Sequence, residues 1–145
     1  FKYVDSHAKA GAVRDTSLRT TLEASIRQRL AASKNMVIIL SQDTRKSGSM
    51  LSYEIEKAVD TYEIPLIIAY TGYNSILNPA VLHPRWPNAL TSRIKTVPAK
   101  AIHIPFKQTA ILEAIGQFTV GSNNLSIPLQ FYNRETQVNW GYIER

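Results

Sequence analysis

Apolar and polar residues alternate along the chain in blocks that predict strands and helices in turn. Apolar runs rich in β-branched residues lie at positions 36–40 and 64–70, and residues 101–106 read as a further strand with His103 near its middle. Each run is too short for a buried helix and is typical of a strand covered on both faces. A further strand is expected at residues 1–5.

Helical periodicity fills the intervals between these strands. A leucine or isoleucine recurs every fourth residue through a helix expected at residues 20–33, where Thr20 and Glu23 have the spacing of a capping box. Apolar stripes of the same kind follow in residues 51–62 and 110–118. Strands alternating with amphipathic helices predict right-handed βαβ crossovers, and hence an α/β domain with a mainly parallel sheet covered by helices on both faces.

The remaining segments are less regular. Residues 71–100 contain four prolines and a short helix expected at residues 87–94. A long irregular insertion in a compact domain is usually functional or mobile. Residues 121–145 are expected to form an irregular tail whose aromatic side chains cover an edge of the core. We expect the 145 residues to form a single domain.

Composition narrows the classes of partner and site. A net charge of +6 favours anionic partners such as nucleotides, but the basic residues are scattered without aromatic interleaving, which argues against nucleic acid. No apolar stretch approaches the roughly 18 residues that a membrane helix needs. The absence of cysteine excludes a thiolate nucleophile and fits a cytoplasmic protein. No two histidines have metal-ligand spacing, and His103, in mid-strand, is expected to be packed in the core.

Candidate chemistry is concentrated after residue 40. Ligands of open parallel sheets bind beyond the carboxyl ends of the strands, and here a polar loop leads into a helix N-terminus, whose free amides attract anions. Glu54 lies one turn into that helix, about 90° from the middle of its apolar stripe. It is the acid of that helix nearest the loop, whereas Glu56 and Asp60 point towards solvent. On pattern alone, such a glutamate is more often a surface residue favoured by the helix dipole than a catalytic group.

These segments resemble the TIR-like (Toll/interleukin-1 receptor-like) family, which has a flavodoxin-like fold, and particularly the bacterial TIR-like proteins of Thoeris-type antiphage defence. Residues 33–41 match the family's Ser-Asp-x-apolar strand and residues 62–67 its GKPII-like strand. Residues 50–55 stand where the family has W-V-x-x-E-I, with Met50 in place of the tryptophan and Glu54 in place of the glutamate.

The resemblance implies an enzyme that uses NAD as a substrate and needs no cofactor or metal. In active members, the glutamate of this motif is the catalytic residue for cleaving the nicotinamide–ribose bond, and Glu54 matches it. A carboxylate there would stabilise an oxocarbenium-like ribose, with ADP-ribose or a cyclic isomer as product. From their position in the loop, the residues expected to contact ribose and phosphate are Thr44, Arg45, Ser47 and Ser49.

A second reading stays open, in which the domain is a non-catalytic TIR-like module for homotypic assembly or nucleotide sensing. Met50 in place of the tryptophan favours it. So does the start of the chain, because residues 1–5 resemble the family's second strand rather than its central first strand. We therefore expect the native protein to extend upstream of Phe1 by a strand and a helix, on the order of 30 to 40 residues.

Overall fold

The strands in the described part of the protein form one parallel sheet. The computed structural model describes residues 16–43, 50–96, 99–122 and 124–144. Within them, a four-stranded sheet has the order β1-β2-β3-β4, with parallel pairing throughout. The strands are β1 (Met36–Leu40), β2 (Leu66–Tyr70), β3 (Ala101–Pro105) and β4 (Gln130–Phe131). The apolar runs predicted the first three strands to within two residues at either end, whereas the strand expected at residues 1–5 lies outside the described part.

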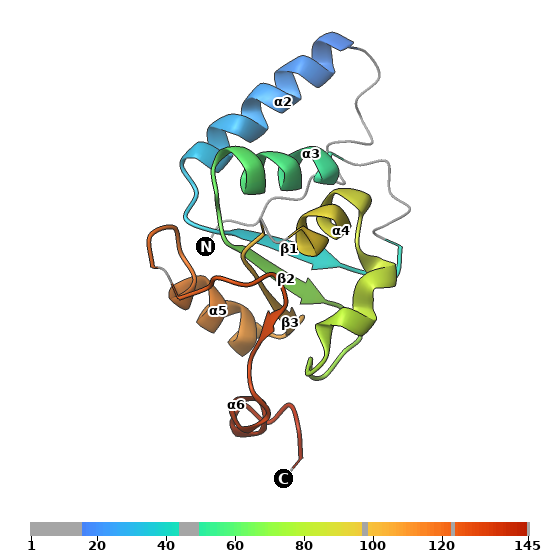
Figure 1. The fold of residues 1–145 in the computed structure, drawn as a ribbon, viewed down its shortest axis with the longest axis vertical. Helices are drawn as coiled ribbons and strands as arrows, with labels where there is room; N and C mark the ends of the chain where they lie inside the picture. The colour runs from blue at the N-terminus through green and yellow to red at the C-terminus, as the bar shows by residue number, and fades with distance from the viewer. Residues whose placement is uncertain (1–15, 44–49, 97–98, 123, 145) are drawn as a thin grey trace.

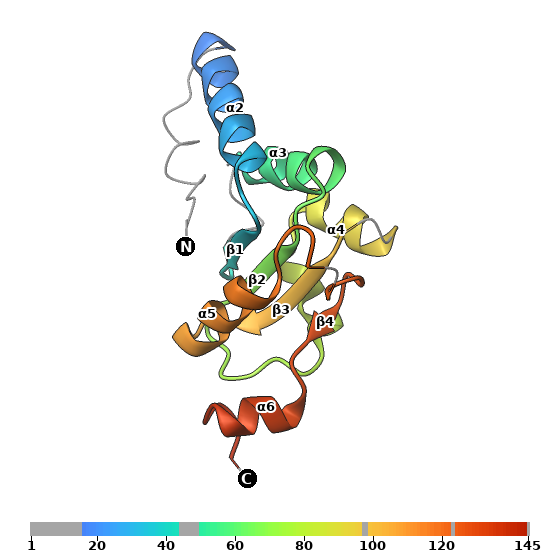
Figure 2. The same ribbon diagram turned by 90° about the vertical axis from the view of Figure 1, so that its left-hand side faces the viewer.

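Helices cover both faces of this sheet, which confirms the predicted α/β class and its flavodoxin-like, TIR-like architecture. The described helices are α2 (Thr16–Ala31), α3 (Leu51–Glu56) with the π-helical turn η2 (Lys57–Thr61), the 3-10 helix η3 (Pro79–Arg85), α4 (Asn88–Lys95), α5 (Gln108–Gln117) and α6 (Arg134–Asn139). Figures 1 and 2 show α2, α3 and α4 on one side of the sheet and α5 on the other. None of the described helices is long and apolar enough to cross a bilayer.

The two-sided core explains the apolar runs. Successive strand residues face opposite sides of a sheet. In β1, Ile38 and Leu40 accordingly pack with α2, α3 and α4, whereas Val37 packs with α5. All five residues of β2 are buried. Because both faces are covered, both sets of positions in β1 and β2 are largely apolar.

The start of α2 differs from its prediction. The helix already contains Thr20 in its interior, so the expected capping box does not begin it. Instead, Glu23 pairs with Arg19 one turn earlier, at 3.3 Å between Oε2 and Nε. A Thr-x-x-Glu sequence can also lie inside a helix, where the glutamate pairs with a basic residue four positions earlier.

The proline-containing segment is more regular than expected. It forms η3 and then α4, and Pro87 immediately precedes the first residue of α4. Arg93 of α4 pairs with Asp60 of η2 through Nε–Oδ1 (3.2 Å) and Nη2–Oδ2 (2.6 Å). The segment is thereby fixed to the helix that follows β1.

The C-terminal segment was predicted to be irregular but contributes β4 and α6. Buried Gln137 explains how it is held: its Nε2 donates to the carbonyls of Ile76 (2.8 Å) and Tyr132 (2.7 Å). Its Oε1 accepts from the backbone N–H of Ile76 at 3.0 Å. As predicted, aromatic residues of this segment, Tyr132, Trp140 and Tyr142, pack against the core, here on the α5 side.

Candidate functional site

Arg85 marks the carboxyl edge of the sheet. Its Nη1 donates to the carbonyl of Leu40, which ends β1, at 3.2 Å, and to that of Thr71, just after β2, at 2.7 Å. The guanidinium also lies 5.0 Å from the centre of the Tyr73 ring. A half-buried cation is thus held where open parallel sheets bind ligands. Arg85 was not among the residues predicted from the sequence, where its one signal was its place in the proline-containing segment.

The loop residues expected to contact the substrate cannot be placed. Thr44, Arg45, Ser47 and Ser49 lie outside the described residues, so their roles remain predictions. At the described beginning of this loop, the backbone N–H of Asp43 donates to Ser41 Oγ at 3.3 Å. Within the described part of the chain, no three His, Asp or Glu side chains are grouped as a metal site would need.

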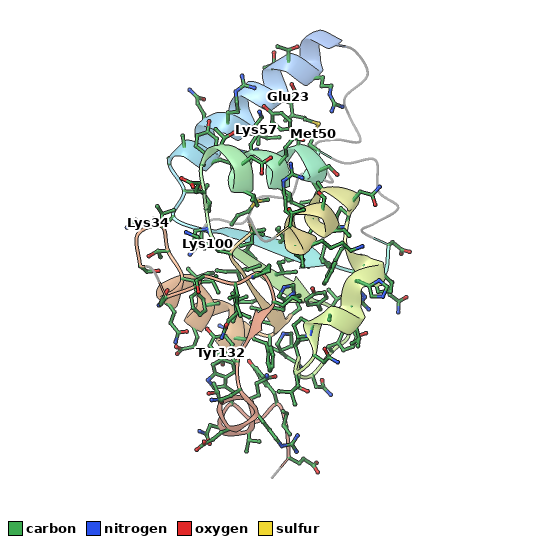
Figure 3. All side chains as sticks on the ribbon, in the orientation of Figure 1. Glu23, Lys34, Met50, Lys57, Lys100 and Tyr132 are labelled. Carbon is green, nitrogen blue, oxygen red and sulfur yellow. The ribbon has the colours of Figure 1, made fainter. Side chains whose placement is uncertain are left out.

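Glu54 is a core residue rather than a residue at the edge of its helix's apolar stripe. It lies in the first turn of α3, and 2% of its surface is exposed. The prediction that it stands outside the packed core is therefore wrong. A projection of one helix assigns its polar flank to solvent, but α2 packs across α3 (Figure 2), and α2 residues line the same cavity as Glu54. Glu56 is exposed, as expected, and Met50, at the family's tryptophan position, is buried at the beginning of α3 (Figure 3).

The Glu54 side chain lines a small cavity between α2, α3 and β1. The other lining residues are Ile26, Arg29, Leu30, Ser33, Asn35, Met36 and Val37. Met36 and Val37 begin β1, so this cavity lies towards the amino end of the strand and not at the carboxyl edge, where we expected the glutamate to act. Its volume of about 20 Å³ has room for about one water molecule.

Arg29 brings a positive charge to the same cavity. Its Nε and Nη2 are buried and have no hydrogen-bond partner among the described residues. The neighbouring polar groups use their donors elsewhere: Ser33 Oγ donates to the carbonyl of Arg29 (2.6 Å), and Asn35 Nδ2 donates to the carbonyls of Ile115 and Phe118 (both 3.0 Å). The charged lining residues are Arg29 and Glu54.

Hydrogen bonds among Trp86, which directly follows η3, Tyr70 of β2 and His103 of β3 form a second buried polar cluster. Trp86 Nε1 donates to the Tyr70 hydroxyl at 2.9 Å, and that hydroxyl is 2.6 Å from His103 Nδ1. His103 Nε2 is 2.8 Å from the carbonyl of Pro128. Because a carbonyl can only accept, Nε2 carries the proton and Nδ1 accepts from Tyr70. Burial lowers the pKa of His103 to about 4, which confirms the prediction of a packed core histidine.

This histidine makes the fold sensitive to acid. The unfolded chain protonates its histidine near pH 6.5, whereas folded His103 stays neutral down to about pH 4. Between these values the unfolded state binds more protons, so the free energy of unfolding falls as pH falls, by up to about 3 kcal/mol. Urea unfolding from pH 7 to pH 4 measures the slope. His103→Asn is expected to lose that part of the slope, and substitution of the exposed His83 with Gln is expected to keep it; equal slopes in all three proteins would refute the assignment.

Comparison with known families gives a match that includes the Glu54 region. The sequence model described as the TIR-like domain of the Thoeris protein ThsB matches residues 1–75 of the 145-residue chain. The matched part contains β1, α3 and β2, and the structure has the parallel sheet with helices on both faces that the resemblance implied. The match covers just over half of the sequence, and the chain therefore belongs to the Thoeris ThsB TIR-like domain family.

Proposed function

We propose that this domain cleaves the nicotinamide–ribose bond of NAD in Thoeris-type antiphage defence, with Glu54 as the catalytic carboxylate. The observation that carries the proposal is a glutamate with 2% of its surface exposed. It stands where the resemblance to the TIR-like family implies the catalytic glutamate. Glutamate is almost never fully buried unless it is paired, and buried acids in clefts are candidates for function.

The chemistry requires one fixed negative charge. As nicotinamide leaves with the electron pair of the glycosidic bond, positive charge develops on the ribose. An ionised Glu54 would accept hydrogen bonds from the ribose hydroxyls and oppose that charge in a site shielded from water. Water then adds to the anomeric carbon to give ADP-ribose, or an internal nucleophile adds to give a cyclic product.

The polar loop and Arg85 would hold the rest of the substrate. Thr44, Arg45, Ser47 and Ser49 remain our candidates for ribose and phosphate contacts because their loop leads into α3. Arg85 is added to them as a candidate phosphate contact, since its guanidinium is held at the carboxyl edge of the sheet. The net charge of +6 suits a dinucleotide that carries two phosphates.

One observation favours the second function, a non-catalytic module for homotypic assembly or nucleotide sensing. The cavity beside Glu54 has a volume of about 20 Å³, far less than a ribose occupies. Catalysis by Glu54 therefore requires its surroundings to open when NAD binds. A module that only assembles or senses a nucleotide has no such requirement.

Product analysis tests the proposal directly. The full-length protein is incubated with NAD at low and high protein concentration, so that unassembled and assembled forms are both sampled, and nicotinamide is measured by chromatography. Release above a protein-free blank in either form supports cleavage. If neither form releases nicotinamide, although NAD is bound or the protein self-associates, the non-catalytic function is the better description.

A further inference from the structure

We propose that Arg29 is a positioning residue for Glu54, holding its carboxylate ionised across the cavity that the two side chains share. The catalytic meaning of this inference rests on the proposed function, but the pairing itself does not. Two residues on different helices, 25 positions apart in the sequence, are brought to one cavity of about 20 Å³ between α2 and α3.

The first step of the argument is the chemistry of Arg29. A guanidinium stays protonated in proteins, and a buried charge is expensive unless an opposite charge or hydrogen-bond acceptor compensates it. Nε and Nη2 of Arg29 are buried without a hydrogen-bond partner among the described residues. Of the residues lining the cavity with it, Glu54 has the acidic side chain.

The size of the cavity suits one water molecule that bridges the Arg29 guanidinium and the Glu54 carboxylate. About 20 Å³ accommodates roughly one water molecule. A water placed there would accept from the Arg29 guanidinium and donate to the Glu54 carboxylate, and such a bridge is nearly as favourable as a direct hydrogen bond. The donors of Ser33 and Asn35 are used by backbone carbonyls, so these side chains do not replace Arg29 as the donor to such a water.

Other described charges on the elements packed against α3 are engaged elsewhere or exposed. The strand β1 carries no charged residue. The engaged groups are Arg19 with Glu23, Arg27 with the Tyr53 hydroxyl, Lys57 over the Tyr53 ring and Arg93 with Asp60, while Glu56 and Lys95 are exposed. Arg29 is therefore the described cation best placed to act on Glu54, and a nearby guanidinium favours the ionised form of a carboxyl group.

Carboxyl titration by NMR tests this pairing without any need for activity. Glutamate labelled with ¹³C at the carboxyl carbon is incorporated into the whole chain, and the Glu54 signal is assigned by its loss in Glu54→Gln. We expect the Glu54 carboxyl to be ionised at pH 7 in the parent protein. Arg29→Met should raise the titration midpoint of Glu54 by roughly 1 to 3 pH units. Arg29→Lys should restore most of the difference, and Arg27→Met, on the same helix, should leave it unchanged.

The outcomes separate the pairing from the proposed function. A Glu54 carboxyl that is protonated at pH 7 in the parent protein overturns the pairing, and this test stands even if Arg29→Met does not fold. The same midpoint in parent and folded Arg29→Met also overturns it. A low, Arg29-dependent midpoint in a protein that releases no nicotinamide supports the pairing while defeating the proposed function.

If the parent is active, a kinetic readout distinguishes positioning from mere structural support. Arg29→Met should move the acidic limb of the kcat/KM pH profile upwards by the shift that NMR measures. A uniform loss of kcat/KM with an unmoved acidic limb, or a limb that Arg29→Lys does not restore, would contradict the positioning role.

Discussion

Replacing Glu54 with glutamine is expected to lower nicotinamide release from NAD by about 10²- to 10³-fold. Glutamine keeps the size and hydrogen-bonding capacity of the side chain but removes the charge that opposes the oxocarbenium-like ribose. Initial rates of nicotinamide formation at saturating NAD measure the loss. Because Glu54 is buried beside Arg29, the substitution is also expected to lower Tm, so rates are compared well below the Tm of both proteins.

Glu56→Gln is the matched control for this comparison. Glu56 belongs to the same helix and bears the same charge, but its side chain is exposed. It is expected to keep the parent rate within experimental error. Undiminished activity in Glu54→Gln, or an equal loss in Glu56→Gln, would refute the catalytic assignment and leave the non-catalytic module as the better description.

Tyr70→Phe is expected to reduce the free energy of unfolding by roughly 2 to 6 kcal/mol. The Tyr70 hydroxyl accepts from Trp86 Nε1 and donates to His103 Nδ1. Its removal leaves two buried polar groups without their partner, and each such group costs about 1 to 3 kcal/mol. Urea unfolding at pH 7 provides the measurement.

Tyr73→Phe serves as the control for the same chemical change in an exposed side chain. Tyr73 is 37% exposed, and its ring contact with Arg85 does not depend on the hydroxyl. Its replacement should alter the free energy of unfolding by less than about 0.5 kcal/mol. Similar losses in the two variants would mean that the buried hydroxyl of Tyr70 has no special role in stability.

The sheet was predictable because each central strand is buried on both faces. An apolar run such as 36–40 can be recognised as a strand without knowing which elements pack against it, because apolar residues face both sides of the sheet. β4 could not be found in this way. It has two residues, Gln130 and Phe131, and it is held by pairing with β3 and by the bond from His103 to the carbonyl of Pro128. Contacts at that sequence distance leave no local pattern.

The sequence identified Glu54 as the candidate residue but did not predict which residues surround it. The family motif selected Glu54, yet helical periodicity placed it at a solvent-facing edge because that calculation treats α3 alone. Its burial results from the packing of α2, which also brings Arg29 to the same cavity. The spacing of apolar and polar residues within each helix does not show which charged residues meet when two helices pack together.

The order of the strands has a consequence for how the protein folds during synthesis. Each described strand pairs with the one that follows it in the chain, so the sheet can grow from β1 to β4 in the direction in which the ribosome releases it. The paired residues of neighbouring strands lie 28 to 35 positions apart, so each step of this growth closes a long loop, which slows folding. The bonds from Gln137 to Ile76 span 61 positions and can form only after nearly the whole described chain has emerged. Docking of the C-terminal segment is therefore expected to be the last step of folding.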